Sequence, residues 1–355
     1  MSNSPGNRPD PTSALREGTR VMVRRRLSDA ERGSAAGTPG SGHTLTDVVG
    51  TLVRRDVSTL VVEPRRGPHV EIAVSDVVAA KEIPPSPGRR GCPHRAVTVS
   101  DLEELMVDGW RPLEVERRGR WLLRAGEGYT RRANSCLVLG PTERETVTAL
   151  DDIITWYRER GLPPLLQVPL APGSGPQDDD FVREVTAMGW QVTSPTLVMT
   201  AASAEVSDRG TEPSTRSLDV EVDADITPEW WQLADERARS HDAVARRILT
   251  GSPSQAFVTV REEGVTVAHG RMALAQGWGG LFEVAVTPER RRRGLARALV
   301  GRCADEAARR GARSLYLQVG AENTPAVALY KSLGFTVHHT YVYLRTPEPA
   351  SPRTA

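Results

Sequence analysis

The sequence predicts an α+β protein that consists of a small all-β barrel followed by two units of alternating strands and helices. Residues 17–82 carry short runs in which apolar residues alternate with polar ones, a pattern typical of antiparallel strands joined by tight turns. In residues 96–346, strand patterns alternate with amphipathic helix patterns, and their order occurs twice. A length of 355 residues also favours several folded parts over a single core.

Changes in composition set the expected boundaries of these parts. Stretches rich in Pro, Gly, Ser and Thr have the composition of linkers and tails rather than of packed elements. We expect a disordered tail at 1–16, the barrel at 17–82, a linker at 83–95, the middle unit at 96–200, a second linker at 201–216, the C-terminal unit at 217–346 and a disordered tail at 347–355. Within the barrel, Glu31–His43 is expected to form a long flexible loop.

The overall charge excludes the recruitment of a partner by a global electric field. Lys and Arg number 46 against 45 Asp and Glu, so the net charge is +1.

The opening residues lack the apolar segment of a signal peptide, and no apolar run is long enough to span a bilayer, so we expect a cytoplasmic protein without a membrane partner. Cys92, Cys136 and Cys303 have neither metal-ligand spacing nor a disulfide pattern, which predicts no metal site.

The barrel carries runs of arginine that resemble a basic patch, at Arg24–Arg26, Arg54–Arg55 and Arg65–Arg66. Acidic residues are interspersed with them, and the runs lack interleaved aromatic residues that would stack on bases. The sequence therefore disfavours nucleic acid as a partner. We expect either a purely structural barrel or one that docks a protein partner.

A site for an anion is predicted in the C-terminal unit. The apolar strand Val284–Val286 leads into a turn that contains Arg291–Ala296, and a helix pattern follows from 297 to 310. A glycine-bearing turn before a helix directs several backbone N–H groups to one point, and the helix adds its unpaired first-turn donors and the positive end of its dipole. Gly294 allows a ligand to approach the backbone closely, so a pyrophosphate fits this anion cradle, residues 291–296.

From this cradle onwards the sequence resembles the GNAT superfamily of N-acetyltransferases. The family motif Gln/Arg-x-x-Gly-x-Gly/Ala is matched by Arg291, Gly294 and Ala296. The strand pattern Ser314–Val319 and the segment Asn323–Phe335 follow in the order and spacing of the family. The resemblance implies the acyl-CoA N-acyltransferase fold, acetyl-CoA as cosubstrate, no metal, and transfer of the acetyl group in a ternary complex to a primary amine of a small molecule or a protein.

The middle unit resembles a second, degenerate copy of the same unit. Arg160–Val168 is similar to Arg310–Val319, and Met188–Trp190 is similar to Leu333–Phe335. In place of the glycine cradle stands Leu137–Thr146, whose acidic residues would repel a pyrophosphate at a helix start. We therefore expect tandem GNAT-like units of which only the C-terminal one binds the cosubstrate, while the middle one covers it and shapes the acceptor cleft. Chance similarity of two α/β units is the alternative.

The resemblance also implies roles for individual residues. Tyr330 would be the general acid that protonates the CoA thiolate, and Asn323 would hydrogen-bond the pantetheine arm. Their seven-residue spacing predicts that both project from one helical face. The alternative is that Tyr330 only packs against Phe335. The residues expected to bind the cosubstrate are Val284, Val286, Arg291, Arg292, Arg293, Gly294, Leu295, Ala296, Asn323 and Tyr330.

The general base is left open by the sequence. Some family members carry a glutamate on the strand before the asparagine, where this chain has Gln318, which cannot accept a proton. Glu283 is the nearest carboxylate on the adjacent strand, and it faces the cleft only if a β-bulge interrupts the alternation from Val286. A water chain or an acceptor that arrives already neutral are the alternatives.

Two tryptophans and several histidines complete the candidates. Thr227-Pro228 is a helix start signal, and in the family the following helix lines the acceptor side. Trp230 and Trp231 on it either form an aromatic acceptor wall or pack in the core, and we expect packing for at least one. The histidines without ligand spacing, expected to be structural or exposed, are His241, His269, His338 and His339. A catalytically inactive CoA-binding module that regulates or docks a partner is the competing hypothesis for the whole chain.

Overall fold

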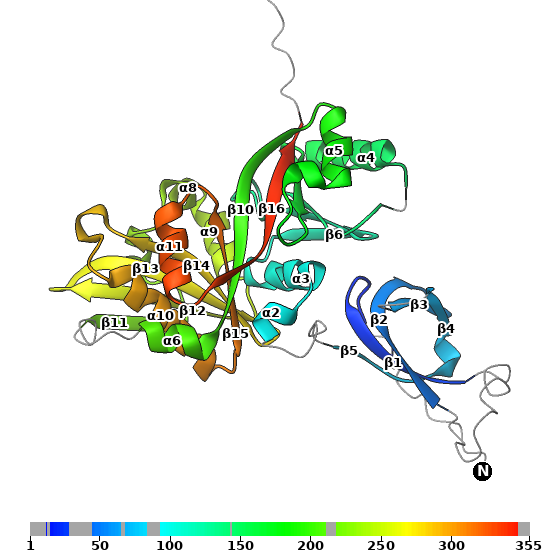
Figure 1. Ribbon diagram of the computed structural model, residues 1–355, viewed down its shortest axis with the longest axis horizontal. Coiled ribbons are helices and arrows are strands. Elements are labelled where there is room, and N and C mark those ends of the chain that lie inside the picture. Colours follow the sequence, from blue (N-terminus) through cyan, green and yellow to red (C-terminus); the bar gives the residue numbers. More distant parts are fainter. Residues whose placement is uncertain are drawn as a thin grey trace, which may run out of the picture. The chain divides into compact units, whose positions relative to one another are not determined.

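Figure 1 shows the computed structural model of the chain. The structure describes residue 12 and residues 15–27, 45–64, 68–83, 93–142, 144–210 and 218–346. The loop expected at Glu31–His43, the pair Arg65–Arg66, Cys92 and the tail expected at 347–355 therefore lie outside the described residues. The chain divides into two compact units, residues 1–85 and residues 86–355.

The first unit contains a five-stranded antiparallel sheet with the strand order β4-β3-β2-β1-β5. Its strands are β1 (Arg20–Arg26), β2 (Leu45–Arg55), β3 (Thr59–Pro64), β4 (Val70–Ala73) and β5 (Val77–Glu82). Alternation along these strands directs one set of side chains inward, and the buried set includes Val21, Val23, Leu52, Leu60 and Ile72. The predicted small all-β barrel is confirmed.

Two details of the barrel differ from the sequence-based expectation: the residue at which it begins, and how its arginines are paired. Leu15 is only 4 % exposed and packs in the barrel core, and Arg16 donates to both carboxylate oxygens of Glu82 at 3.0 to 3.1 Å. The disordered tail expected at 1–16 is therefore wrong for its last two residues. Arg24 of the predicted basic patch donates to both oxygens of Asp47 at 2.8 Å, which offsets its charge locally.

The second unit is organised around one mixed sheet of eleven strands in the order β11-β12-β13-β14-β15-β10-β16-β9-β8-β7-β6. The strands are β6 (Glu114–Arg118), β7 (Trp121–Ala125), β8 (Cys136–Val138), β9 (Leu165–Pro169), β10 (Gln191–Ala202), β11 (Asp219–Asp223), β12 (Ser254–Glu262), β13 (Val265–Ala275), β14 (Trp278–Val286), β15 (Ser314–Gly320) and β16 (Thr336–Arg345). Two neighbouring pairs, β8–β9 and β14–β15, are parallel. A helix connects the strands of each pair, so the same α+β arrangement occurs twice, as the sequence predicts.

The two halves of this sheet exchange their last strands at its centre. β10, which ends the middle half, lies between β15 and β16, whereas β16, which ends the C-terminal half, lies between β10 and β9. The two long strands run side by side in Figure 1, β10 in green and β16 in red. Their antiparallel register pairs Leu197 with Thr340 and Val198 with His339. Each half therefore completes its sheet with a strand from the other.

Helices pack against this sheet on both faces. They are α2 (Pro93–Ala96), α3 (Val99–Gly109), α4 (Thr146–Glu159), α5 (Asp180–Ala187), α6 (Ser203–Gly210), α7 (Pro228–Gln232), α8 (Glu236–Ser240), α9 (Asp242–Leu249), α10 (Leu295–Arg309) and α11 (Thr324–Ser332). Along β14 and β15, Leu281 and Leu317 face the apolar cluster of α10, while Phe282 and Tyr316 face an aromatic cluster shared with α3 and α7 to α9. In the described ranges, no helix combines the length and the apolar character that crossing a membrane requires.

The linker predicted at 201–216 is wrong over its described part, because residues 201–202 end β10 and residues 203–210 form α6. α6 packs against α10, and a Cβ atom on Gly301 would lie 2.6 Å from the Gly210 Cα. The helix buries mainly small residues and Val206, so its sequence lacks the apolar periodicity that would have marked it. Within the other predicted linker, Pro93–Ala96 forms α2.

A buried polar network connects the exchanged strand β16 to the middle half. The two carboxylate oxygens of Glu103 on α3 lie 2.9 Å from His339 Nε2 of β16 and 2.9 Å from Gln167 Nε2 of β9. Gln167 Oε1 in turn accepts from Arg124 Nη2 at 2.9 Å. All four side chains are buried, so each hydrogen bond replaces water that cannot reach these atoms.

Glu103→Ala should lower the free energy of unfolding by about 3–5 kcal/mol, because the change leaves the imidazole of His339 and the amide of Gln167 buried without their acceptor. Urea unfolding followed by tryptophan fluorescence measures this loss. The matched control is Glu184→Ala on α5, where the side chain is exposed and the expected change is within about 0.5 kcal/mol. Similar values for the two variants would contradict the role of the network.

Candidate active site

The candidate site lies where the parallel strands β14 and β15 part. Their ladder covers Trp278–Leu281 and Ser314–Leu317, although β14 continues to Val286 and β15 to Gly320. Since β13 and β15 are the sheet neighbours of β14, the edge of β14 that faces β15 has no strand partner beyond Leu281 among the described residues. Backbone N–H groups on that edge are available to a ligand.

A β-bulge in β14 accompanies this parting. Arg271 of β13 pairs with Phe282, but His269 pairs with Ala285, so two residues of β14 oppose Gly270 alone. Glu283 is the first of these two residues and has a left-handed backbone with φ of 52°. The expected bulge is therefore present, but Glu283 does not turn toward the groove that borders the gap between the two strands, which Val284 and Val286 line and Glu283 does not.

A groove of about 890 Å³ borders the gap. It is formed by the end of β14, the cradle and start of α10, and α11. All predicted cosubstrate-binding residues except Arg293 line it: Val284, Val286, Arg291, Arg292, Gly294, Leu295, Ala296, Asn323 and Tyr330. Residues from three separate segments of the sequence thus meet along one surface.

The cradle has the backbone geometry of an anion site. Gly294 precedes α10 as its N-cap with φ of 81°, a left-handed conformation that other residues adopt only with strain. The N–H of Ala298 donates to the Gly294 carbonyl at 3.1 Å, so the amides of residues 295–297 precede the first helical hydrogen bond. Residues 291–294 therefore form a loop, and the unpaired amides of the helix start follow it directly.

The arginines near the cradle divide into two groups. Arg290 and Arg293 both lie 3.1 Å from the carboxylate of Glu262, and of these two only Arg290 lines the groove. Three further arginines, Arg291, Arg292 and Arg297, line the groove. Guanidinium groups are cations that match the oxygens of a phosphate.

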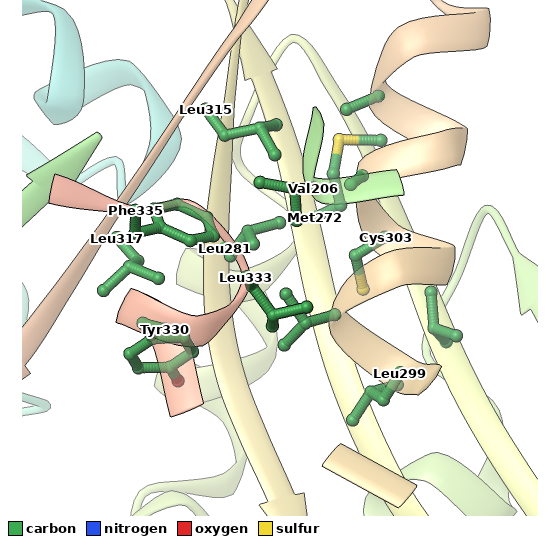
Figure 2. Packing of buried hydrophobic residues seen from close by; sticks show 14 of the residues in the cluster. Val206, Met272, Leu281, Leu299, Cys303, Leu315, Leu317, Tyr330, Leu333 and Phe335 are labelled. Atoms are coloured by element: carbon green, nitrogen blue, oxygen red, sulfur yellow. The ribbon is translucent and has the colours of Figure 1, made fainter. Parts of the chain in front are cut away.

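Tyr330 both packs in the core and lines the groove. Its ring lies edge-on to Phe335 with centroids 5.8 Å apart, and its hydroxyl points away from Phe335 in Figure 2. Burial raises the pKa of Tyr330 to about 12, so the phenol stays protonated at neutral pH. Packing and access to the groove are therefore not alternatives at this position.

The structure gives Asn323 a capping role that was not predicted from the sequence. This residue precedes α11 as its N-cap, and its Oδ1 accepts a hydrogen bond from the N–H of Ala326 at 3.2 Å. Asn323 lies just outside α11, and both Asn323 and Tyr330 line the groove. The capping bond fixes the side chain and leaves the donor Nδ2 for a ligand.

Glu283 projects to the face of β14 opposite the groove, among charged and aromatic side chains. Burial raises the pKa of Glu283 above its ordinary value, and the negative charge of Asp235 raises it further, while Arg132 and Arg271 act in the opposite direction. Burial raises the pKa of Tyr129, and the negative charge of Glu283 raises it further. A carboxyl group poised in this way can exchange a proton at a higher pH than an exposed glutamate.

Sequence reasoning missed Tyr129, Arg132 and Asp235. The first two lie on the β7–β8 connection of the middle half, and Asp235 caps α8 by accepting from the N–H of Ala238 at 2.7 Å. They approach Glu283 only through tertiary packing, so no local motif could have pointed to them. Asn134 holds the connection in shape, because its side-chain oxygen accepts from two backbone N–H groups of that loop.

The remaining candidates have structural surroundings. Gln318 on β15 donates from Nε2 to Met106 Sδ at 3.4 Å. Trp230 is buried and donates from its indole to the Gly270 carbonyl at 2.8 Å, which confirms packing for one of the two tryptophans. Trp231 stacks beside it and carries the guanidinium of Arg246 over its ring. Among the described residues, no group of three or more His, Cys, Asp or Glu side chains is arranged to hold a metal ion.

Two parallel strands that part beside a glycine-bearing loop and a helix N-terminus define the acyl-CoA N-acyltransferase fold. A solved structure of the same fold is the GCN5-related N-acetyltransferase from Kribbella flavida, which is 16% identical and superposes with a TM-score of 0.51 over 71% of this chain and 96% of its own. At that identity the similarity concerns the fold alone.

The chain belongs to the acetyltransferase family described as "Probable histone acetyltransferase Rv0428c C-terminal", whose model matches residues 97–344. Residues 15–81 match the model "Rv0428c N-terminal Sm-like domain". The chain is 30% identical to the probable histone acetyltransferase Rv0428c of Mycobacterium tuberculosis over 92% of this chain and 94% of that protein. It is 25% identical to the uncharacterized N-acetyltransferase YobR of Bacillus subtilis over 67% of this chain and 94% of that protein.

Gly294→Ala should weaken the binding of CoA by about tenfold or more, because a Cβ at φ of 81° strains the cradle that presents the amides. Isothermal titration of CoA into the full-length protein measures the effect. Gly311→Ala is the matched control: Gly311 has φ of 92° at the opposite end of α10, and a Cβ there meets no atom within 4 Å. Equal loss of CoA affinity in both variants would show that the cradle has no special role.

Proposed function

We propose that the C-terminal half of this chain transfers an acetyl group from acetyl-CoA to a primary amine by direct attack within a ternary complex. The observation that carries the proposal is the junction at β14: one face borders a groove with an anion cradle, and the other presents a carboxyl group with a raised pKa. Val284 and Val286 line the groove, whereas Glu283 lies with Asp235, Arg132 and Arg271, so the two proposed functions would occupy opposite faces of one strand.

The residues of the groove fit a CoA thioester. The diphosphate would be held by the backbone amides of the cradle and by Arg291 and Arg292, which are the groups that anions prefer at a helix N-terminus. Asn323 and the unpaired edge of β14 would hold the pantetheine arm, whose amides need donors and acceptors. When bound, acetyl-CoA supplies an activated acetyl group. A backbone N–H after the bulge is placed to polarise the carbonyl of that group.

The acceptor amine must lose a proton before or during attack. An alkyl ammonium has a pKa near 10.4, so a base is needed at neutral pH. In the proposed reaction Glu283 takes this proton, either directly or through one water, while the amine nitrogen forms a bond to the carbonyl carbon and the carbon–sulfur bond breaks. The second proton leaves the nitrogen for solvent as the amide forms. The desolvated carboxylate of Glu283 is a stronger base than an exposed one.

The thiolate that leaves needs a hydrogen-bond donor or a proton. Tyr330 lines the groove and remains protonated, so it donates a hydrogen bond to the sulfur and delivers the proton as solvent replaces it. The acceptor itself, a small molecule or a protein amine, is not determined by these residues. The mycobacterial relative is named a probable histone acetyltransferase, so protein amines belong in the panel of acceptors to be tested.

Glu283→Gln should lower kcat/KM by about 10²–10⁴-fold with any amine that arrives protonated, while CoA affinity stays unchanged. Release of the CoA thiol with a panel of amines measures the rate. Because Glu283 acts as carboxylate, the wild-type rate should rise with pH through the raised pKa of this group, and the variant should lose that limb. CoA binding without turnover on any amine would favour an inactive binding module.

The same substitution also tests the electrostatic cost of the site. Burial raises the pKa of Glu283, so the folded state binds the proton of this group more tightly than the unfolded state does. The stability contributed by the protonated carboxyl is therefore complete below the unfolded pKa. It is lost as the pH rises through the folded pKa. Glu283→Gln should therefore unfold at higher urea than wild type at pH 7, and the two should converge in acid. A destabilised variant at pH 7 would contradict this reading.

Tyr330→Phe should reduce kcat by about 10²-fold or more with little change in CoA affinity or stability, since the ring retains its contact with Phe335. Thiol release and isothermal titration separate the two effects. Since the pKa of Tyr330 is about 12, no loss of wild-type activity should arise from its ionisation at ordinary alkaline pH. A variant with unchanged kcat would remove Tyr330 from the mechanism.

A further inference from the structure

The face of β14 opposite the groove carries an aromatic cluster around Glu283. Trp110, which follows α3, lies 6.0 Å from Tyr129 and 5.3 Å from Phe282 between ring centroids. Phe282 lies 5.9 Å from Tyr316 of β15 in an edge-on arrangement. The cluster therefore combines side chains from both halves of the large sheet.

Two arginines enter this cluster, and one of them is fully satisfied. The guanidinium of Arg271 is completely buried and donates from Nε to the Leu249 carbonyl at 2.7 Å. Its Nη1 donates to the Gly109 carbonyl at 2.8 Å, and its Nη2 donates to Ser252 Oγ at 2.7 Å. Arg271 has the surroundings of a structural arginine, since each nitrogen has an acceptor.

The other arginine, Arg132, has none of these bonds. Its guanidinium carbon lies 4.8 Å from the ring centroid of Trp110 and 5.4 Å from that of Phe282, which supports the charge by cation–π attraction. Nε and Nη1 are buried, and no described residue accepts a hydrogen bond from them. Buried donors without acceptors are costly, and a purely structural position would be filled better by an apolar side chain. The arrangement is that of an arginine suited to an incoming anion.

Arg132 lies close to the strand segment that carries Glu283. Its guanidinium carbon is 5.4 Å from the ring centroid of Phe282, the residue before Glu283, and its positive charge opposes the rise in the pKa of Glu283. Arg132 belongs to the middle half and Glu283 to the C-terminal half. An acceptor placed between them would meet a cation at one end and a proton acceptor at the other.

We propose that the acceptor amine also carries a carboxylate, as an amino acid does, and that Arg132 binds this carboxylate while Glu283 receives the proton of the amine. This inference rests on the proposed function and names the substrate class of the same site. The ammonium N–H bond breaks and its proton moves to Glu283, the new carbon–nitrogen bond forms, and the carbon–sulfur bond of the thioester breaks. A second N–H proton then leaves the nitrogen for solvent, and the departing sulfur gains a proton through Tyr330. The carboxylate stays intact on Arg132 throughout.

The surroundings favour a carboxylate over a phosphate. A carboxylate is planar, carries one charge and matches the fork of a guanidinium. A phosphate would bring up to two charges close to Glu283 and Asp235, whose mutual repulsion already raises the pKa of Glu283. The aromatic walls supply apolar contact for the remainder of a small amino acid.

The test is the binding of each proteinogenic amino acid and of its α-amide to the full-length, CoA-loaded protein, measured by isothermal titration. At least one amino acid should bind, and its amide should bind about tenfold or more weakly because the amide lacks the charge. Arg132→Gln should weaken the amino acid by about 10- to 100-fold and remove the preference over the amide. Arg132→Lys should recover part of the preference because it keeps the charge.

Controls separate binding from folding. Arg131→Gln alters the adjacent, exposed arginine and should leave both affinities unchanged. The CoA affinity and the melting temperature of Arg132→Gln show whether that variant is folded, and Arg132→Lys carries the test if it is not. An aminoalkylphosphonate is included as the phosphate-like probe.

The proposal is overturned if no amino acid binds, if amides bind equally well, if the phosphonate binds more tightly than the amino acid, or if Arg132→Gln weakens amino acid and amide alike. It is also overturned if a protein amine is acetylated and amino acids do not compete. Thiol release tests the proposed function separately. If amino acids bind in a way that depends on Arg132 but are not acetylated, the carboxylate site is supported and the proposed enzymatic function is rejected.

Discussion

The antiparallel pairing of β10 with β16 is the constraint on which the rest of the large unit depends. Each strand ends one half of the sequence and completes the sheet of the other, so neither half has a full set of strand partners alone. The buried network of Glu103, His339 and Gln167 lies at the same junction. Removing either half would expose both an edge strand and buried polar groups, each of which is costly.

The pairing of β10 with β16 gives the middle half a structural role, although this half lacks an anion cradle. α4 begins after Glu145 as its N-cap, whereas α10 begins after Gly294 in a left-handed conformation. The negative charge of Glu145 at this helix start disfavours an anion there. The middle half instead supplies β10 to the sheet and the β7–β8 connection to the face that Glu283 occupies. It therefore has a structural role at the centre of the sheet, and in the proposed function it also contributes to the acceptor side.

The parts of the fold that sequence could predict are those set by local rules. The cradle follows from Gly294 and the helix start, the barrel from alternating apolar residues, and the repeated order from similar strand and helix patterns. The linker predicted at 201–216 is wrong at its described residues, 201–210, because α6 buries Val206 and small residues, which carry little periodic signal. The exchange of β10 and β16 was not foreseen, because strand order depends on long-range pairing that no local pattern encodes.

The site shows the same division between local and tertiary information. The anion cradle is read from one contiguous motif, whereas the capping role of Asn323 is visible only in the structure. The environment of Glu283 is assembled from a bulge in β14, the N-cap of α8 and a loop of the other half, which meet only after the two halves have folded together. A left-handed glutamate, a desolvated carboxylate and an arginine with unsatisfied donors are each unfavourable for stability, and all three occur on this one face. Their concentration there, beside an otherwise well-satisfied Arg271, is what separates a surface built to act on a ligand from a core built to pack.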